Sequence, residues 1–343
     1  MKERSAFDVS WGTIGKILIA AALVWAWLQL WQFVMVIIIA MVMAVALDPL
    51  VRKLETRGVP RGLAALASVL LLAAIAVAMI AASWVSITEQ SRLILQNITS
   101  FSDQVRATFP MIDRLMPAGA QSGSGGTGIA SYAMGFGRSL AKAAGMFVVA
   151  LVLTVYFLIE WKATIEWLIA FVPSEHRQKA RRTLSESRET VYRYVIGNAM
   201  TSLITAVATF VVLLALKVPA ALMLALIAGL LDFIPIVGFL LSLAVTALLA
   251  ATVSMTTLLA VVAFYLLFNA LENYVIMPRV YGHELALSNL AVLIAVAVGG
   301  QLGGVMGALL ALPIAAIYPT VERIWLRQRL SDDTVDVHQR LSA

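Results

Sequence analysis

The feature that most constrains this chain is a series of apolar runs, many of them long enough to cross a membrane, that recurs from Trp11 to Trp325. A helix needs about 20 mostly apolar residues to cross the roughly 30 Å hydrocarbon core of a bilayer. The 343-residue chain is 61% hydrophobic and only 13% charged, whereas soluble domains carry about 25% charged residues. The sequence therefore predicts an all-α, polytopic membrane protein and excludes an ordinary soluble domain.

Four runs are long enough to cross alone, and they cover residues 62–86, 143–159, 195–216 and 255–276. The first apolar run, over residues 14–47, is too long for one ordinary span. Trp25, Trp27 and Trp31 lie near its middle, and tryptophan favours the membrane–water interface. We therefore expect two short helices that meet at a tight turn near residues 29–32, in preference to one long tilted helix.

The C-terminal runs are shorter and are separated by helix-breaking residues. Residues 220–231 and 239–253 flank a break that contains Asp232, Pro235 and Gly238, while residues 285–298 and 305–318 flank a glycine-rich stretch. These patterns predict two broken or re-entrant helical hairpins around one full helix, and about eight transmembrane segments in all. Each hairpin returns to its starting side whether it crosses or dips in, so the sequence leaves both forms open.

Two segments outside the apolar runs have patterns of their own. Apolar residues recur at threes and fours over residues 87–116, which predicts an amphipathic extramembrane helix. It could lie on the outer leaflet, but we favour packing on the bundle and on a neighbouring protomer of a homo-oligomer. Residues 117–131 are rich in glycine and serine and predict a flexible linker. A helix should start at Pro173-Ser174 and continue into the span from residue 195.

These patterns divide the chain into five parts. They are N-terminal transmembrane helices (1–87), an extracytoplasmic helix with its linker (88–139), a transmembrane helix followed by a basic cytoplasmic helix (140–194), a core with two hairpins (195–320) and a cytoplasmic tail (321–343). Lysine and arginine collect in the cytoplasmic loops next to spans. The basic residues of this chain gather at residues 2–16, 52–61, 162–193 and 323–329. This distribution predicts that both termini are cytoplasmic.

The sequence lacks the motifs of several catalytic chemistries. It has no cysteine, and its histidines, His176, His283 and His338, lie far apart. It contains no phosphate-binding G-x-x-x-x-G-K-[ST] loop and no G-x-S-x-G nucleophile motif. Its basic residues lie between apolar runs instead of in one stripe, unlike those of nucleic-acid-binding proteins. We therefore expect no enzyme, no cofactor, no metal site and no nucleic-acid partner.

Two carboxylates fall where a membrane span would bury them. A charged side chain at bilayer depth costs roughly 2.5–3.5 kcal/mol on insertion scales, so Asp232 and Glu272 need an explanation. Asp232 directly precedes the break with Pro235 and Gly238, where free backbone groups of a discontinuous helix could bind an ion or a polar solute. The alternative is an interfacial turn in which Asp232 only caps a helix end.

Polar residues and glycines mark two further candidate regions. Asn269, Glu272 and Asn273 share one helical face, and Arg279 follows on nearly the same side, which fits either a translocation path or hydrogen bonds and a Glu272–Arg279 pair that hold the bundle. We expect Pro278 to end this helix. The second region contains Gly299, Gly300, Gln301 and Gly303, whose G-x-x-x-G spacing allows close packing or a break.

Asn198 and Thr201 could likewise line a translocation path or form hydrogen bonds between packed helices, and we favour helix packing.

The sequence around these residues resembles a known family. Asp232-Phe233-Ile234-Pro235-Ile236-Val237-Gly238, Glu272-Asn273, Met277-Pro278-Arg279-Val280-Tyr281-Gly282 and Leu312-Pro313-Ile314-Ala315-Ala316 are similar to motifs of the autoinducer-2 exporter family. The resemblance implies a multi-spanning protein of the bacterial inner membrane with cytoplasmic termini. Members are also proposed to exchange sodium or other monovalent cations for protons. This chain has Ile236 where such proteins often have a tyrosine, which weakens any transfer of substrate identity.

The sequence therefore supports one hypothesis and two rivals. The first is a secondary transporter or facilitator in which both hairpins meet the Asn269–Asn273 face, with Asp232 and Glu272 coupling transport to a proton or cation. The second is a cation/proton antiporter with the same architecture. The third is a non-transporting oligomeric scaffold that binds partners through residues 87–116.

Overall fold

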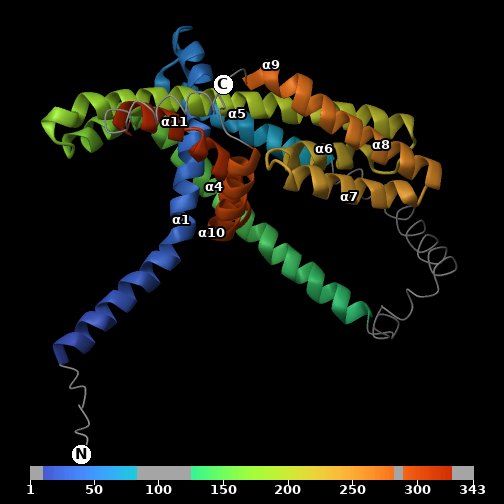
Figure 1. The fold of residues 1–343 in the computed structure, drawn as a ribbon, viewed down its shortest axis with the longest axis horizontal. Coiled ribbons are helices and arrows are strands. Elements are labelled where there is room, and N and C mark those ends of the chain that lie inside the picture. The colour runs from blue at the N-terminus through green and yellow to red at the C-terminus, as the bar shows by residue number, and fades with distance from the viewer. Residues whose placement is uncertain (1–10, 83–124, 282–288, 327–343) are drawn as a thin grey trace, which may run out of the picture.

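The computed structural model of this chain describes residues 11–82, 125–281 and 289–326, and these residues form helices and short connections without a strand (Figure 1). The helices are α1 (Trp11–Glu55), a helix over Arg61–Ala82, α4 (Gly125–Ala170), a 3₁₀ turn (Ser174–His176), α5 (Arg177–Ala215), α6 (Ala221–Asp232), α7 (Val237–Ala251), α8 (Met255–Leu271), a π-helical turn (Glu272–Ile276), α9 (Met277–Tyr281), α10 (Asn289–Ala315), α11 (Tyr318–Val321) and a second π-helical turn (Glu322–Leu326). The predicted all-α class is confirmed for this part of the chain.

Six of the described helical stretches are long and apolar enough to cross a membrane. Large apolar side chains such as Leu203, Val207 and Leu214 of α5 are exposed, as expected for side chains that contact lipid. The helices α6 and α7 contain 12 and 15 residues, which is below the usual length of a span. The protein is therefore a multi-pass membrane protein, and a total of about eight segments stays a prediction.

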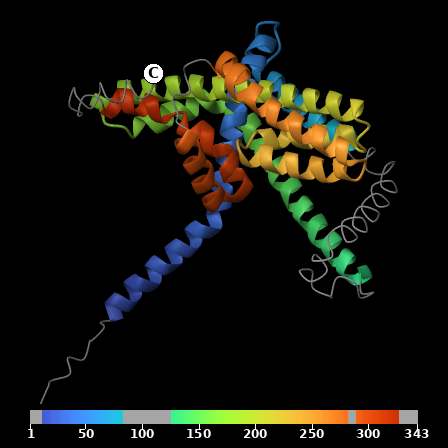
Figure 2. The same ribbon diagram turned by 45° about the vertical axis from the view of Figure 1, so that its right-hand side comes forward.

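The first helix differs from its prediction. The turn expected near residues 29–32 is wrong, because α1 continues as one 45-residue helix through all of its tryptophans. Between Gly15 and Pro49 the sequence contains no glycine or proline, so no residue there favours a break. The N-terminal half of α1 extends away from the other helices, and burial starts at Met35 (Figures 1 and 2).

The segments after α1 partly match what was predicted for the linker and for the helix that follows it. The linker predicted over residues 117–131 is wrong from Gly125 onward, where α4 already begins. Once a span has nucleated a helix, each further turn costs little, so the helix extends into this small-residue sequence. The helix predicted to start near Pro173-Ser174 and to run into the following span is confirmed by the 3₁₀ turn and α5. The amphipathic helix predicted over residues 87–116 lies outside the described residues.

The break between α6 and α7 is confirmed. The two helices pack side by side and are joined by a turn over residues 233–236. Gly238 is required there, because a Cβ at this position would overlap the carbonyl oxygen of Leu231. Together with α5 and α8, the hairpin encloses a core around Leu213, Leu224 and Val261.

The helix after this hairpin does not end at Pro278, contrary to the prediction. It passes through the π-helical turn Glu272–Ile276 and continues as α9 to Tyr281. A proline inside a helix lacks one backbone donor and clashes with the preceding turn. A π-helical turn directly before Pro278 is wider than an α-turn, so it leaves room for the proline ring without ending the helix.

The second break is confirmed within α10. The chain leaves helical geometry at Gly304, whose φ is 60°, a value that glycine adopts without strain. The arms on either side pack so closely that a Cβ at Gly299 or at Gly307 would overlap the other residue's backbone oxygen. The tip of this hairpin lies against α1, where the Trp31 indole donates a 2.6 Å hydrogen bond to the Leu302 carbonyl. Figure 2 shows the two arms of α10 beside α1.

Candidate functional site

The helix α5 carries polar residues on its buried side and apolar residues on its exposed side. Its buried polar side chains are Ser187, Asn198, Thr201, Ser202, Thr205 and Thr209. From Asn198 to Thr209 most of them recur at intervals of three or four residues, which places them along one helical face. This face packs against α6. A helix with its polar groups inside and its apolar groups outside is the pattern expected for a span that lines a polar site within a membrane protein.

Asp232 lies at the C-terminal end of α6, next to this polar face. The Ser202 Oγ donates a hydrogen bond of 3.1 Å to the Asp232 Oδ2. Thr205 lies beside the same carboxylate, and its hydroxyl is buried without a hydrogen-bond partner among the described residues. A carboxylate has about four acceptor positions, so Asp232 keeps the capacity to bind a proton, a cation or a donor group of a solute beside the Ser202 hydroxyl.

Glu272 is the second carboxylate of the site. It begins the π-helical turn and is only 8% exposed. Glu272 lies within electrostatic range of Asp232, so the structure places two carboxylates that are 40 residues apart in the sequence in one region. No ion pair between Glu272 and Arg279 occurs within the described residues, where Glu272 is buried and Arg279 is exposed. The Glu272–Arg279 pair of the second alternative is therefore not formed, whereas the hydrogen bonds between helices in that alternative stay a prediction.

A second group of polar side chains comes from α7 and α8 and lies beside Thr209 of α5. The Tyr265 hydroxyl of α8 and the Thr246 hydroxyl of α7 are 3.0 Å apart and both are buried. Ser242 and Thr209 lie beside the same phenol. A series of buried hydroxyl groups therefore extends between the helices from the neighbourhood of Asp232 to Tyr265. We call the buried residues Asn198, Thr201, Ser202, Thr205, Thr209, Ser242, Thr246 and Tyr265 the polar seam.

The turn beside Asp232 is strained. Ile236 has φ 66° and ψ −57°, a rare combination for a β-branched residue. The Val237 amide donates a 2.7 Å hydrogen bond to the Pro235 carbonyl, which closes a γ-turn with positive φ at its centre. Backbone strain of this kind costs of order 1–3 kcal/mol and often occurs at functional sites.

The other predicted site residues fall in two places. Asn269 is partly buried, whereas Asn273 is exposed and donates a 2.8 Å hydrogen bond to the Asn269 carbonyl of its own helix. Gly299 and Gly300 lie in the first arm of α10, and Gln301 is exposed near its tip. A Cβ at Gly303 would lie 3.1 Å from the Met35 sulfur of α1. The tip of the second hairpin therefore contacts α1.

The two hairpins nevertheless meet, because the turn of the α6–α7 hairpin contacts the base of the α10 hairpin. Ile234, in the turn after Asp232, packs in one buried cluster with Tyr194 of α5 and with Val296 and Leu312 of α10. This cluster joins the first break to both arms of the second hairpin. The first break thus contacts α10 through Ile234, at the apolar base of the second hairpin and not at its glycine-rich tip.

Most residues of the polar seam were not predicted from the sequence. Asn198 and Thr201 were candidates but Ser202, Thr205 and Tyr265 were not, because single hydroxyl groups are common in apolar spans. A usable signal was present, since the polar residues between Asn198 and Thr209 recur at helical spacing. The described residues contain no group of three or more acidic, histidine or cysteine side chains that could hold a metal ion.

Comparison with known proteins gives an independent finding. Residues 17–327 match the model of the AI-2E family transporter. The protein YrrI of Bacillus subtilis is 26% identical over 189 residues, which cover 51% of this chain and 53% of YrrI. A transport protein relative from Mycobacterium tuberculosis is 28% identical over 193 residues, which cover 55% of this chain and 52% of the relative. The chain thus spans about half the length of these curated relatives.

A third relative matches over a longer stretch. The AI-2 transport protein TqsA of Escherichia coli is 24% identical over 302 residues, which cover 83% of this chain and 84% of TqsA.

Proposed function

Because this chain belongs to the AI-2E transporter family, we propose that it is a secondary transporter or facilitator that exports a small polar molecule, such as autoinducer-2, across the bacterial inner membrane. The observation that carries the proposal is the Asp232 carboxylate, hydrogen-bonded to Ser202 next to Glu272 at one end of the polar seam. A partly buried and a buried carboxylate within one membrane bundle are costly, so a role in transport accounts for their presence.

The polar seam suits a small polar solute. Its hydroxyls can both donate and accept hydrogen bonds, so they can replace the hydration shell of a neutral solute with several polar groups. The breaks at Asp232–Val237 and at Gly304 supply the non-helical backbone that transporters use near their substrate sites. In this proposal the α6–α7 hairpin moves against α5 and exposes Asp232 to each side in turn.

A monovalent cation/proton antiporter is the second candidate. The observation that favours it is that Asp232 and Glu272 lie within electrostatic range of each other. Two carboxylates in this relation repel each other, and the repulsion is relieved when one of them binds a proton or a cation. Exchange at one shared site would then couple the two ions.

The arrangement in the membrane is part of the same proposal. Both termini lie in the cytoplasm, as supported by the arginines and lysines that flank the described spans, among them Arg52, Arg61, Arg188 and Arg323. We also propose that the chain forms a homo-oligomer through residues 87–116 together with the bundle.

Flux in proteoliposomes tests these functions against each other. The purified chain is reconstituted under imposed sodium and proton gradients, and a separate arm follows autoinducer-2 movement. Signal-molecule flux above that of empty liposomes supports the exporter, and sodium-driven proton movement without it supports the antiporter. Absence of flux in both arms would contradict both functions and favour the non-transporting scaffold.

A further inference from the structure

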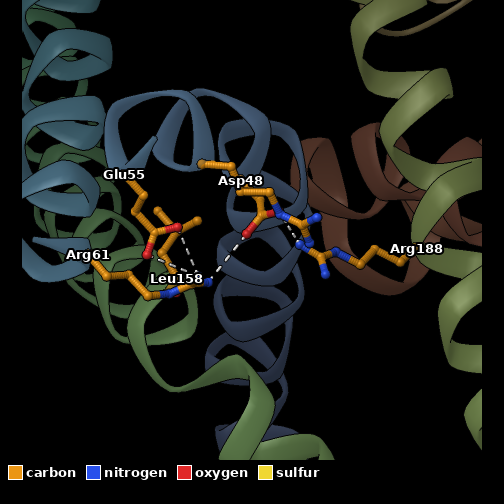
Figure 3. Close-up of polar contacts among 6 residues, drawn as sticks. Asp48, Glu55, Arg61, Leu158 and Arg188 are labelled. Carbon is orange, nitrogen blue, oxygen red and sulfur yellow. Dashed lines mark hydrogen bonds and ion pairs between the residues drawn. The ribbon is translucent and has the colours of Figure 1, made fainter. Parts of the chain in front are cut away.

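A charged cluster lies outside the polar seam, where α1, the helix over Arg61–Ala82, α4 and α5 meet. Its centre is Asp48 of α1, which is 4% exposed. Three guanidinium groups from three helices converge on this carboxylate (Figure 3). The Arg188 Nη2 lies 2.5 Å and the Arg52 Nε 2.6 Å from the Asp48 Oδ2, and the Arg61 Nη2 lies 3.4 Å from the Oδ1. One carboxylate therefore faces three cations.

The three arginines differ in how many of their N–H donors already have a partner. Arg61 also contacts Glu55 at 3.3 Å and donates a 2.8 Å hydrogen bond from its Nε to the Leu158 carbonyl, so both sides of its guanidinium are in use. The Arg188 guanidinium instead lies over the ring of Trp161, 5.5 Å from its centroid. The Arg52 side chain is 62% exposed. Arg52 and Arg188 therefore keep N–H groups that can bind a further acceptor.

A cavity of about 340 Å³ lies directly beside this cluster. We call it the basic hollow, and it is lined by Arg52, Glu55, Arg61, Trp161, Lys162 and Arg188. Its four cations face two carboxylates, those of Glu55 and the neighbouring Asp48, which leaves two positive charges in excess. No ion pair to Lys162 occurs within the described residues. The volume is in the range of ligand sites, which is roughly 300–1,000 Å³.

We propose that the basic hollow binds a phosphate oxyanion, carried either by an anionic phospholipid headgroup or by a free phosphate. Guanidinium groups match the geometry of phosphate oxygens, and lysine adds a mobile point charge. Arg52, Lys162 and Arg188 supply these donors from three different helices, and Asp48 holds two of the three in place. A bound phosphate would neutralise the excess charge and tie α1, α4 and α5 together at this end of the bundle.

The test measures thermal unfolding of the purified full chain in a neutral detergent, titrated separately with phosphatidylglycerol, phosphatidylcholine and inorganic phosphate. A ligand that binds only the folded state raises the unfolding midpoint with a saturable dependence on its concentration. We expect saturation with phosphatidylglycerol, with inorganic phosphate, or with both, and no effect of phosphatidylcholine. Saturation with the lipid alone identifies the headgroup as the ligand, and saturation with inorganic phosphate identifies a site that accepts the free anion.

Two variants separate the basic hollow from general charge effects. Lys162→Gln removes a lining cation but keeps the Asp48 contacts, and Arg52→Gln removes a second one. Each should raise the half-saturating ligand concentration about tenfold, which corresponds to the loss of one charge-assisted contact. Arg182→Gln is the matched control, since Arg182 pairs with Glu186 outside the basic hollow. An equal shift with phosphatidylcholine, no saturable shift, or unchanged saturation in Lys162→Gln would overturn the proposal.

Discussion

The Ser202 hydroxyl donates a hydrogen bond of 3.1 Å to the Asp232 carboxylate and so joins the middle of α5 to the end of α6. The contact connects residues 30 positions apart and joins Asp232 to the polar seam. The adjacent turn is the strained γ-turn at Ile236. A hydrogen bond, a carboxylate and a helix break therefore occur together at the place where the proposed transport path begins.

Replacing Ser202 tests whether this hydrogen bond matters for transport. Ser202→Ala removes the donor to Asp232, and hydrogen bonds to charged groups contribute about 1.5–3 kcal/mol. We expect the flux in proteoliposomes to fall about tenfold, with normal amounts of folded protein. Thr256→Ala is the matched control, because Thr256 is exposed at the start of α8. Equal flux in the two variants would show that the contact only packs α5 on α6.

Removal of the Tyr265 hydroxyl tests the inner end of the polar seam. Tyr265→Phe leaves the Thr246 hydroxyl buried without its partner, and an unsatisfied buried group costs about 1–3 kcal/mol. The midpoint of thermal unfolding in detergent should therefore fall. Tyr274→Phe should leave it unchanged, since Tyr274 is 83% exposed. A lower midpoint in Tyr274→Phe than in Tyr265→Phe would contradict this description of the seam.

The α6–α7 hairpin depends on a glycine at one position. Gly238→Ala should lower the free energy of unfolding by about 1–3 kcal/mol, the usual range for overpacking, because the new Cβ meets the Leu231 carbonyl oxygen. Gly300→Ala is the control, since its nearest neighbour would be the Ala308 Cβ at 3.9 Å. Chemical denaturation of both variants measures the difference. Equal stability would mean that α7 does not approach α6 so closely.

For the strained turn at Ile236 we predict a gain of stability on substitution, in contrast to the loss expected for Gly238→Ala. Ile236→Gly removes the side chain that disfavours positive φ and should raise the free energy of unfolding by about 1 kcal/mol. The control, Val237→Gly, lies in the first turn of α7 with an equally exposed side chain and should be neutral or destabilising. Denaturation midpoints of the two variants provide the comparison. A loss of stability in Ile236→Gly would show that the isoleucine packs favourably in this turn.

The two breaks in the C-terminal half could be predicted from sequence because their causes are local. Pro235 and Gly238 fall within a few residues of one another, and Gly304 lies among other glycines. The continuity of α1 was missed because an interface preference of Trp25 to Trp31 is only a tendency, and it is weaker than the absence of any helix-breaking residue. The π-helical turn before Pro278 follows from how a helix accommodates proline, which residue spacing alone does not reveal.

The candidate site could be predicted only in part. Asp232 and Glu272 stood out because charge is rare in apolar runs, but their proximity depends on how α6 and the α8–α9 helix pack on α5. The same holds for Asp48, whose three arginines come from separate helices. The polar seam needed the burial of Ser202, Thr205 and Tyr265, which is a property of packing.

The most direct test of the central claim is transport by Asp232→Asn and Glu272→Gln in proteoliposomes, compared with wild type and with Glu166→Gln. Glu166 is an exposed carboxylate that pairs with Arg181, so its replacement controls for the loss of one negative charge. We expect Asp232→Asn and Glu272→Gln each to reduce the flux at least tenfold, while Glu166→Gln transports like wild type. Wild-type flux in both site variants would contradict a transport role for the carboxylate pair.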